Sequence, residues 1–292
     1  MKSIKLNTPV EKLKFRDFEF FVKRDDLIDI DFSGNKARKL YYYLDHGFEG
    51  IKKLVSYGSN QSNAMYSMSV LARLKKWEFE YYTDHISSYL LDNPSGNYLG
   101  ALQNSAKIID LEHNDKKELK STKEILFIPE GGYIDKARYG LEILANELKE
   151  WIKKQENDDF KIFLPSGTGT TALFLQEFLP YDVYTCACVG DEEYLKKEFF
   201  GLQNDDKLHP KIIKTAKKYH FGKLYKNLYL LWLELKRDIM VEFDMIYDPI
   251  GIETMINNIE IFEGSKVIYI HQGGLLGNTT MLQRYKRKFN LG

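Results

Sequence analysis

Strand-like apolar segments alternate with helix-like segments along most of this 292-residue chain. Residues 53–57 and 78–83 have the length and composition of strands, and residues 63–76 between them have helical spacing. Parallel strands need a crossover connection, which is usually a helix, so this alternation predicts mainly parallel sheets covered by helices on both faces. The sequence therefore predicts an α/β fold.

Further segments continue the alternation. The other expected strands cover residues 18–23, 107–111, 125–128, 161–164, 183–189 and 266–270. The other expected helices cover residues 37–44, 94–104, 116–123, 135–154, 171–179, 228–240, 253–259 and 277–288, with one more beginning at Glu192. The polar run 155–159 interrupts the series, and we expect a boundary between two lobes there.

The composition restricts the classes of partner. The 42 basic residues balance the 42 acidic ones, so no net field favours nucleic acid or an anionic membrane. No apolar run approaches the ~20 residues of a membrane-spanning helix, and the N-terminal segment lacks the apolar core of a signal peptide. Cys186 and Cys188 are expected to be small core residues, since two thiols alone make a poor metal site. We expect a cytoplasmic protein without a metal.

The turn Ser33-Gly34-Asn35-Lys36 precedes the first expected helix. Lys36 would then lie at a helix entrance, where the helix dipole and the free N–H groups disfavour a cation. A lysine amine that stays neutral is nucleophilic and can form a Schiff base. A solvated lysine beside a turn is the alternative that this motif leaves open.

Two loops between an expected strand and a helix carry groups suited to ligands, since ligands collect at the carboxyl ends of parallel strands. Residues 57–63 (YGSNQSN) offer amides and hydroxyls for a carboxylate or a ring oxygen, or else a helix cap. Residues 165–171 (PSGTGTT) combine exposed backbone N–H groups with threonine hydroxyls, which is typical of a phosphate site. This loop lacks the lysine of a nucleoside-triphosphate loop and the spacing of a dinucleotide motif, and a plain turn is its alternative.

Two more apolar strands end in paired glycines, at residues 128–132 (IPEGG) and 270–274 (IHQGG). The alternative is that these glycines do no more than turn the chain and that His271 is a core histidine whose ring nitrogens are hydrogen-bonded.

Together these motifs resemble the pyridoxal-phosphate enzymes of fold type II, in the group of 1-aminocyclopropane-1-carboxylate deaminase and D-cysteine desulfhydrase. The matching segments occur in the family's order over nearly the whole chain. They are residues 22–27 (VKRDDL), 33–40 (SGNKARKL), 58–63 (GSNQSN), 129–132 (PEGG), 166–171 (SGTGTT), 248–249 (DP) and 271–274 (HQGG). The resemblance implies a tryptophan synthase β-like fold of two lobes, with a small lobe at 45–155 and a large cofactor-binding lobe at 1–44 and 156–292.

The resemblance also implies roles for particular residues. Lys36 would hold pyridoxal 5'-phosphate as a Schiff base and later move protons at the substrate carbon. Asn60 would bond the ring oxygen of the cofactor, and Ser59 and Gln61, with Asn60 beside them, would meet the substrate carboxylate. The phosphate would be held by the loop residues Ser166, Gly167, Thr168, Gly169 and Thr170. Family members are typically homodimers with one site per subunit.

The chain departs from the family near the expected substrate. Phe221-Gly222 stands where the family has Tyr-Gly, and Ile250 stands near the tyrosine that follows Asp-Pro. Tyr219 and Tyr247 are close in sequence and are candidate substitutes. The partner of the cofactor ring nitrogen is expected to be Gln272, with Thr254 and Glu253 as alternatives.

The resulting expectation is a pyridoxal-phosphate-dependent lyase or deaminase of a small amino acid, with a D-cysteine desulfhydrase-like β-elimination that gives a keto acid and ammonia. An amide partner at the ring nitrogen supports a full positive charge less well than a carboxylate, which favours a substrate with a good leaving group. The alternatives are a 1-aminocyclopropane-1-carboxylate deaminase and a non-catalytic homologue that binds the cofactor.

Overall fold

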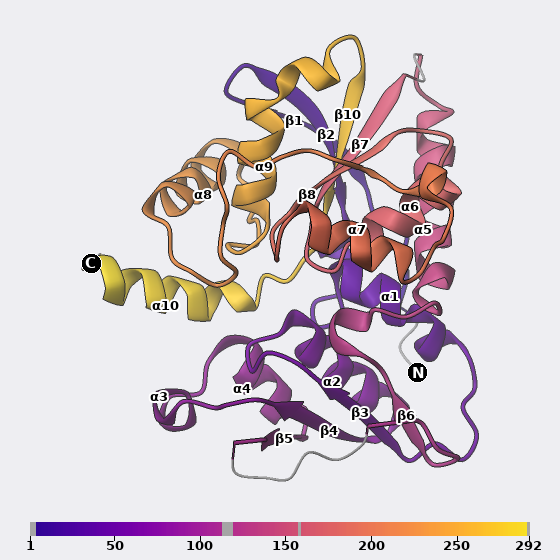
Figure 1. The fold of residues 1–292 in the computed structure, drawn as a ribbon, viewed down its shortest axis with the longest axis vertical. Coiled ribbons are helices and arrows are strands. Elements are labelled where there is room, and N and C mark those ends of the chain that lie inside the picture. The colour runs from indigo at the N-terminus through magenta and orange to yellow at the C-terminus, as the bar shows by residue number, and fades with distance from the viewer. Residues whose placement is uncertain (1–3, 113–118, 157–158, 291–292) are drawn as a thin grey trace.

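The computed structural model describes residues 4–112, 119–156 and 159–290 (Figure 1). Its strands are β1 (Val10–Phe15), β2 (Phe18–Arg24), β3 (Lys53–Tyr57), β4 (Glu78–Thr83), β5 (Ala106–Asp110), β6 (Ile125–Phe127), β7 (Phe160–Ser166), β8 (Val183–Ala187), β9 (Lys211–Ile212) and β10 (Lys266–His271). Its α-helices are α1 (Gly34–Asp45), α2 (Asn63–Lys75), α3 (Ser88–Asp92), α4 (Gly96–Gln103), α5 (Ala137–Ile152), α6 (Thr170–Phe178), α7 (Glu192–Phe200), α8 (Lys226–Ile239), α9 (Asp248–Asn257) and α10 (Gly277–Phe289).

The strands form two sheets. The six-stranded sheet has the order β1-β2-β10-β7-β8-β9, and the four-stranded sheet has the order β5-β4-β3-β6. Every neighbouring pair is parallel except β1 with β2, which are antiparallel. The predicted α/β class with mainly parallel sheets is therefore confirmed. The chain limits assigned above to the two lobes stay a prediction.

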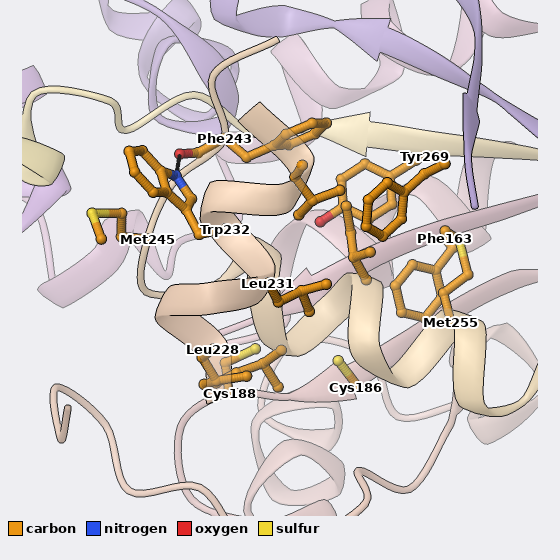
Figure 2. Packing of buried hydrophobic residues seen from close by; sticks show 14 of the residues in the cluster. Phe163, Cys186, Cys188, Leu228, Leu231, Trp232, Phe243, Met245, Met255 and Tyr269 are labelled. Atoms are coloured by element: carbon orange, nitrogen blue, oxygen red, sulfur yellow. Dashed lines mark hydrogen bonds between the residues drawn. The ribbon is translucent and has the colours of Figure 1, made fainter. Parts of the chain in front are cut away.

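Helices cover both sheets, and their apolar faces form the cores. On one side of the larger sheet, α8 and α9 pack against β7 and β10 in the cluster drawn in Figure 2. The indole Nε1 of Trp232 donates to the carbonyl oxygen of Phe243 at 2.8 Å, which satisfies the one polar atom of that ring. Cys186 and Cys188 lie in this cluster as buried free thiols, so their expected role as small core residues is confirmed.

The structure differs from the sequence prediction at several elements. Residues 119–123 form no helix, and residues 116–118 of that expected helix lie outside the described residues. Helix α9 begins at Asp248 rather than at Glu253, because Pro249 suits the first turn and the Asp248 carboxylate accepts from the N–H of Asp244. The short elements β1, α3 and β9 were not expected from the sequence.

A buried ionic network fixes α1 beside α5. The guanidinium of Arg38 is fully buried and donates to both carboxylate oxygens of Asp25, at 2.7 and 2.9 Å. It also donates to Glu147 of α5 at 2.8 Å, and Lys23 of β2 donates to the same carboxylate at 2.6 Å. The network joins α1 to β2 and α5, and so it sets the orientation of α1. Lys36 lies on the same helix, two residues before Arg38.

Replacing Arg38 with methionine should strongly destabilise the protein. The change leaves the Asp25 carboxylate buried without its partner, and breaking a buried pair in this way costs about 3–5 kcal/mol. The free energy of unfolding in urea measures the effect. Arg16→Met is the matched control, because its pair with Glu234 is exposed and should be worth about 1 kcal/mol or less. Equal losses in the two variants would contradict the interpretation.

Candidate functional site

Loops at the carboxyl ends of β3, β7 and β10, together with Glu130 and Gly131 after β6, line one cavity of ≈ 610 Å³. This edge is where ligands collect on parallel sheets. All residues predicted to bind cofactor or substrate lie on its wall, namely Lys36, Ser59, Asn60, Gln61, Ser166, Gly167, Thr168, Gly169, Thr170 and Gln272. The structure thus brings together segments that are far apart in the sequence, while the role of each residue stays a prediction.

Lys36 projects from the first turn of α1, and its Nζ donates to the carbonyl oxygen of Gly131 at 3.2 Å. Burial lowers the pKa of Lys36 from 10.5 to about 8, and the nearby carboxylate of Glu130 opposes that shift. Desolvation is thus the main cause, because it disfavours the charged form of an amine. At neutral to mildly alkaline pH this amine is much closer to its neutral, nucleophilic form than a solvated lysine is.

Gly34 allows α1 to begin directly against the end of β10. Its φ is +64°, and a Cβ at this position would lie 1.8 Å from the carbonyl oxygen of Gln272. The next residue, Asn35, donates its backbone N–H to the same oxygen at 3.0 Å. Only glycine fits this approach, which places Lys36 beside the loop that follows β10.

Lys39 is a cavity residue that the sequence motif did not identify as a ligand. Its Nζ donates to Gly131 oxygen at 3.2 Å, and Gly131 in turn lies against Thr168 of the glycine-rich loop. Burial lowers the pKa of Lys39 strongly, and the charge of Lys36 lowers it further. The sequence signal that could have identified Lys39 is its spacing from Lys36, because residues three apart on a helix share a face.

The glycine-rich loop after β7 has the features of an anion site. Helix α6 starts at Thr170 with Gly169 as its N-cap at φ +71°, so the first N–H groups of the helix face the loop. Ser166 accepts a hydrogen bond from the Thr185 hydroxyl at 2.6 Å, which fixes its side chain. The Thr171 hydroxyl is buried without a hydrogen-bond partner among the described residues.

The loop after β3 holds its amides in fixed directions. Asn60 donates one N–H of its side chain to the carbonyl oxygen of His85 at 2.7 Å. Gln61 donates to Ser95 oxygen at 3.3 Å, and its side-chain oxygen accepts from the Thr280 hydroxyl at 3.3 Å. Ser59, on the cavity wall, accepts from the backbone N–H of Gln61. This wall is polar and partly exposed, as a site for a carboxylate should be.

Gln272 connects two parts of the cavity. Its side-chain nitrogen donates to Pro165 oxygen at 2.6 Å, and its side-chain oxygen accepts from Asn35 at 2.9 Å. Of the two alternatives, Thr254 donates its hydroxyl to Ile250 oxygen, and Glu253 bonds Tyr219 and Asn227. Neither lines the cavity, whereas Gln272 does.

The two candidate tyrosines have different positions. Tyr247 lines the cavity, with its ring against Gly167, whereas Tyr219 points away and donates its hydroxyl to Glu253. Phe221 lines the cavity and contacts the Tyr247 ring, with centroids 5.9 Å apart. Ile250 is buried in the core cluster of α8 and α9.

The last paired-glycine loop also contains His271, a fully buried histidine whose ring nitrogens both have hydrogen-bond partners.

Two named relatives align with most of this chain. A Thermotoga maritima protein provisionally named 1-aminocyclopropane-1-carboxylate deaminase is 25% identical over 92% of this chain and 94% of its own length. A mitochondrial protein of Arabidopsis thaliana, named bifunctional D-cysteine desulfhydrase/1-aminocyclopropane-1-carboxylate deaminase, is 24% identical over 89% of this chain and 73% of its own length. No family model matches the sequence.

Solved structures place the fold in the same class. A crystal structure described as an ACC deaminase homologue superposes with a TM-score of 0.79 at 18% identity, over 96% of this chain and 93% of that chain. A pyridoxal 5'-phosphate-dependent aspartate racemase superposes with a TM-score of 0.62 at 11% identity, over 92% and 90%. A hydrogen sulfide-producing enzyme of Fusobacterium nucleatum has a TM-score of 0.64 at 11% identity, over 91% and 95%.

The chain therefore has the fold of the type II pyridoxal-phosphate enzymes, as the sequence predicted. Its expected similarity to proteins named for 1-aminocyclopropane-1-carboxylate deaminase and D-cysteine desulfhydrase activity is confirmed as well. None of the helices within the described residues has the length and apolar character that a membrane crossing requires.

The lowered pKa of Lys36 should be visible in its reactivity. In cofactor-free protein, acetylation of Lys36 should rise with pH around a midpoint near 8, because the amine is protonated below that value and neutral above it. Competitive labelling followed by peptide mass spectrometry measures the midpoint. The exposed lysines as a group provide the comparison, with an ordinary value near 10.4. A midpoint for Lys36 within their range would show that its amine is solvated.

Proposed function

We propose that this protein is a pyridoxal-phosphate-dependent lyase or deaminase, which eliminates a leaving group from the β-carbon of a small amino acid and releases a keto acid and ammonia. The observation that carries the proposal is the meeting of three groups in one cavity. These are the desolvated amine of Lys36, the glycine-rich loop 166–170 and the amide loop 59–61. The names of the two relatives support the same chemistry.

The residues present fit pyridoxal phosphate. The buried Thr171 hydroxyl, which has no partner among the described residues, and the first N–H groups of α6 are donors for a phosphate. The Lys39 amine, held nearby by its contact with Gly131, is a further hydrogen-bond donor on this side of the cavity. Lys36 would attach to the cofactor aldehyde, and Gln272 would accept from the ring nitrogen. When bound, the cofactor supplies an electron sink for the negative charge that develops on the α-carbon of the substrate.

The protein's own groups would perform the remaining tasks. Ser59, Asn60 and Gln61 would hold the α-carboxylate and so orient the bond from the α-carbon to its proton. Lys36 would take that proton, since an amine with a pKa near 8 is matched to proton transfer near neutral pH. The bond from the β-carbon to its leaving group then breaks, and the electron pair leaves with that group. Water converts the remainder to a keto acid and ammonia.

The alternative activity is ring opening of 1-aminocyclopropane-1-carboxylate. By resemblance, that reaction uses tyrosine hydroxyls beside the ring, and here Phe221 lines the cavity where one of them is expected. Tyr247 lies against Gly167, on the loop assigned to the phosphate. These positions favour elimination over ring opening. A homologue that binds the cofactor without catalysis is the second alternative.

We infer that the protein forms a homodimer, as the resemblance implies, and that its compartment is the cytoplasm. Helix α8 supports a subunit contact, because Leu230 and Leu233 are exposed on neighbouring turns and Met240 is exposed just after the helix. Exposed apolar side chains in one region are typical of a surface that another subunit covers. Sedimentation velocity at several protein concentrations tests the assembly, and a monomer at all of them would contradict it.

Borohydride reduction of the cofactor-loaded protein should fix the mass of the cofactor on Lys36. Lys36→Ala should abolish this label, whereas Lys39→Gln, three residues away on the same helix, should keep it on Lys36. Peptide mass spectrometry locates the label. A label on Lys39 or on another lysine in the wild-type protein would refute the assignment.

Thiol elimination should be faster than cyclopropane ring opening. A lost general acid–base group typically costs 10²–10⁴-fold in rate, and a leaving thiolate needs this help less than a ring carbon does. The value of kcat/KM for pyruvate formation from D-cysteine is compared with that for 2-oxobutyrate formation from 1-aminocyclopropane-1-carboxylate. Faster formation of 2-oxobutyrate would establish the deaminase alternative. Inactivity of fully loaded protein towards D-cysteine, D-serine and the cyclopropane substrate would favour the non-catalytic one.

A further inference from the structure

Helix α10 presents a basic face to the cavity, beyond the residues assigned above to cofactor and α-carboxylate. Figure 1 shows this helix between α8, which packs beside the larger sheet, and α4, which packs beside the smaller one. Thr280, Arg284 and Arg287 of α10 all line the cavity wall, and their spacing places them on one side of the helix. The side chain of Arg284 is partly buried and that of Arg287 is exposed.

Two guanidinium groups lie on this face. Arg284 donates to the carbonyl oxygen of Gly222 at 2.8 Å and contacts the sulfur of Met281, while Arg287 stacks over the Tyr89 ring at 4.4 Å. Within residues 4–112, 119–156 and 159–290, neither forms an ion pair with a carboxylate. Burial lowers the pKa of Arg284, and the like charge of Arg287 lowers it further. A partly buried cation beside another cation is a costly arrangement that an anion would relieve.

The cofactor phosphate does not need these arginines. The loop 166–170 has Lys39 close to it through Gly131, and it contacts Tyr247. Arg284 is attached instead to Gly222, next to Phe221, which stands where the family has a tyrosine near the substrate. Its guanidinium therefore belongs to the side of the cavity that faces a substrate side chain.

Along α10, Arg284 lies one helical turn from the residue that contacts the expected α-carboxylate site. Thr280 donates its hydroxyl to Gln61, so position 280 marks the end of the cavity where the α-carboxylate is expected. Residue 284 lies one turn further along α10, and four residues at 1.5 Å each give about 6 Å. A rise of this size keeps both positions within reach of one small molecule that carries two anionic groups.

We propose that Arg284, assisted by Arg287, selects amino acids whose side chain ends in a carboxylate or a similar oxyanion. The proposal rests on the function proposed above and specifies its substrate class. The leaving group carries the anionic end. Lys36 takes the α-proton, the bond from the β-carbon to the leaving atom breaks, and the electron pair goes with the anionic group. Uptake of one water gives pyruvate and ammonia, so atoms and charges balance.

Binding tests the proposal without requiring turnover. Calorimetry of the cofactor-loaded protein compares glutamate with glutamine, in both enantiomers, because the two differ only in the charged end. Charge-assisted hydrogen bonds contribute about 1.5–3 kcal/mol, so the acid should bind about 10- to 100-fold more tightly than the amide. The affinities of phosphoserine and serine are compared in the same way. The larger of the two charged-to-neutral ratios shows whether a phosphate or a carboxylate is the preferred anion.

The variants assign the preference to Arg284. Arg284→Gln should reduce the acid-to-amide ratio to about one, chiefly by weakening the binding of the acid, and an unchanged unfolding midpoint in urea shows that the variant is folded. Arg284→Lys should keep part of the ratio. Lys286→Gln removes the same charge from the same helix outside the cavity wall, and it should keep the whole ratio.

Turnover extends the test to the reaction. S-carboxymethylcysteine should give pyruvate with a higher kcat/KM than its neutral amide, S-carbamoylmethylcysteine, and Arg284→Gln should remove that difference. Equal binding of acid and amide by the wild-type protein overturns the proposal, as does a ratio unchanged in the Arg284→Gln, Arg287→Gln double variant. Failure of the proposed function has a different signature, namely no elimination from any substrate. In that case the acid-to-amide binding ratio, measured by calorimetry on wild-type protein and on Arg284→Gln, still tests whether Arg284 binds the anionic group.

Discussion

The approach of α1 to the end of β10 is the contact on which the cavity depends. Gly34 brings its backbone so close to Gln272 that no side chain fits, and the N–H of Asn35 donates to the same carbonyl oxygen at 3.0 Å. The Gln272 side chain then bonds both Asn35 and Pro165, at 2.9 and 2.6 Å. Because Pro165 precedes the glycine-rich loop, these contacts set the distance between Lys36 and the groups expected to hold the phosphate.

The same helix is fixed from its other side by buried charge. Arg38 joins α1 to Asp25 and Glu147, which lie on separate elements. Such a network is costly to assemble in a low-dielectric interior. Once every hydrogen bond is made, however, it holds the joined elements in one relative orientation. Lys36 and Lys39 are the contrasting case, since they are buried towards a cavity with little compensating charge, which lowers their pKa values. One helix thus carries a cation that is neutralised by carboxylates and two amines that, within the described residues, are hydrogen-bonded only to a carbonyl oxygen.

The cavity combines the pattern of the resembling family with local replacements. The loops expected to hold the cofactor follow that pattern, whereas Phe221 departs from it, and the arginines of α10 line the same cavity. Replacing a tyrosine with Phe221 removes a proton donor, and the guanidinium groups of α10 are donors suited to an anion. Both features lie outside the loop 166–170 that is expected to hold the phosphate.

The sequence alone determined the fold class and most of the candidate site. Alternating strands and helices imply parallel sheets, and the loops at the carboxyl ends of parallel strands meet at one edge, so residues 59–61 and 166–170 could be grouped from the order of the elements. Local patterns also placed Lys36 at the start of α1. The antiparallel strand β1 and the early start of α9 were missed, because short elements carry weak periodicity.

Only the tertiary structure decided which neighbouring side chains reach the cavity. Tyr219 and Tyr247 are equally plausible in the sequence, yet one bonds Glu253 and the other lies against Gly167. Lys39 and Arg284 likewise became cavity residues through the packing of helices that lie far apart in the chain. The direction of a side chain depends on the rotation and contacts of its element, and these follow from long-range packing rather than from the residues beside it.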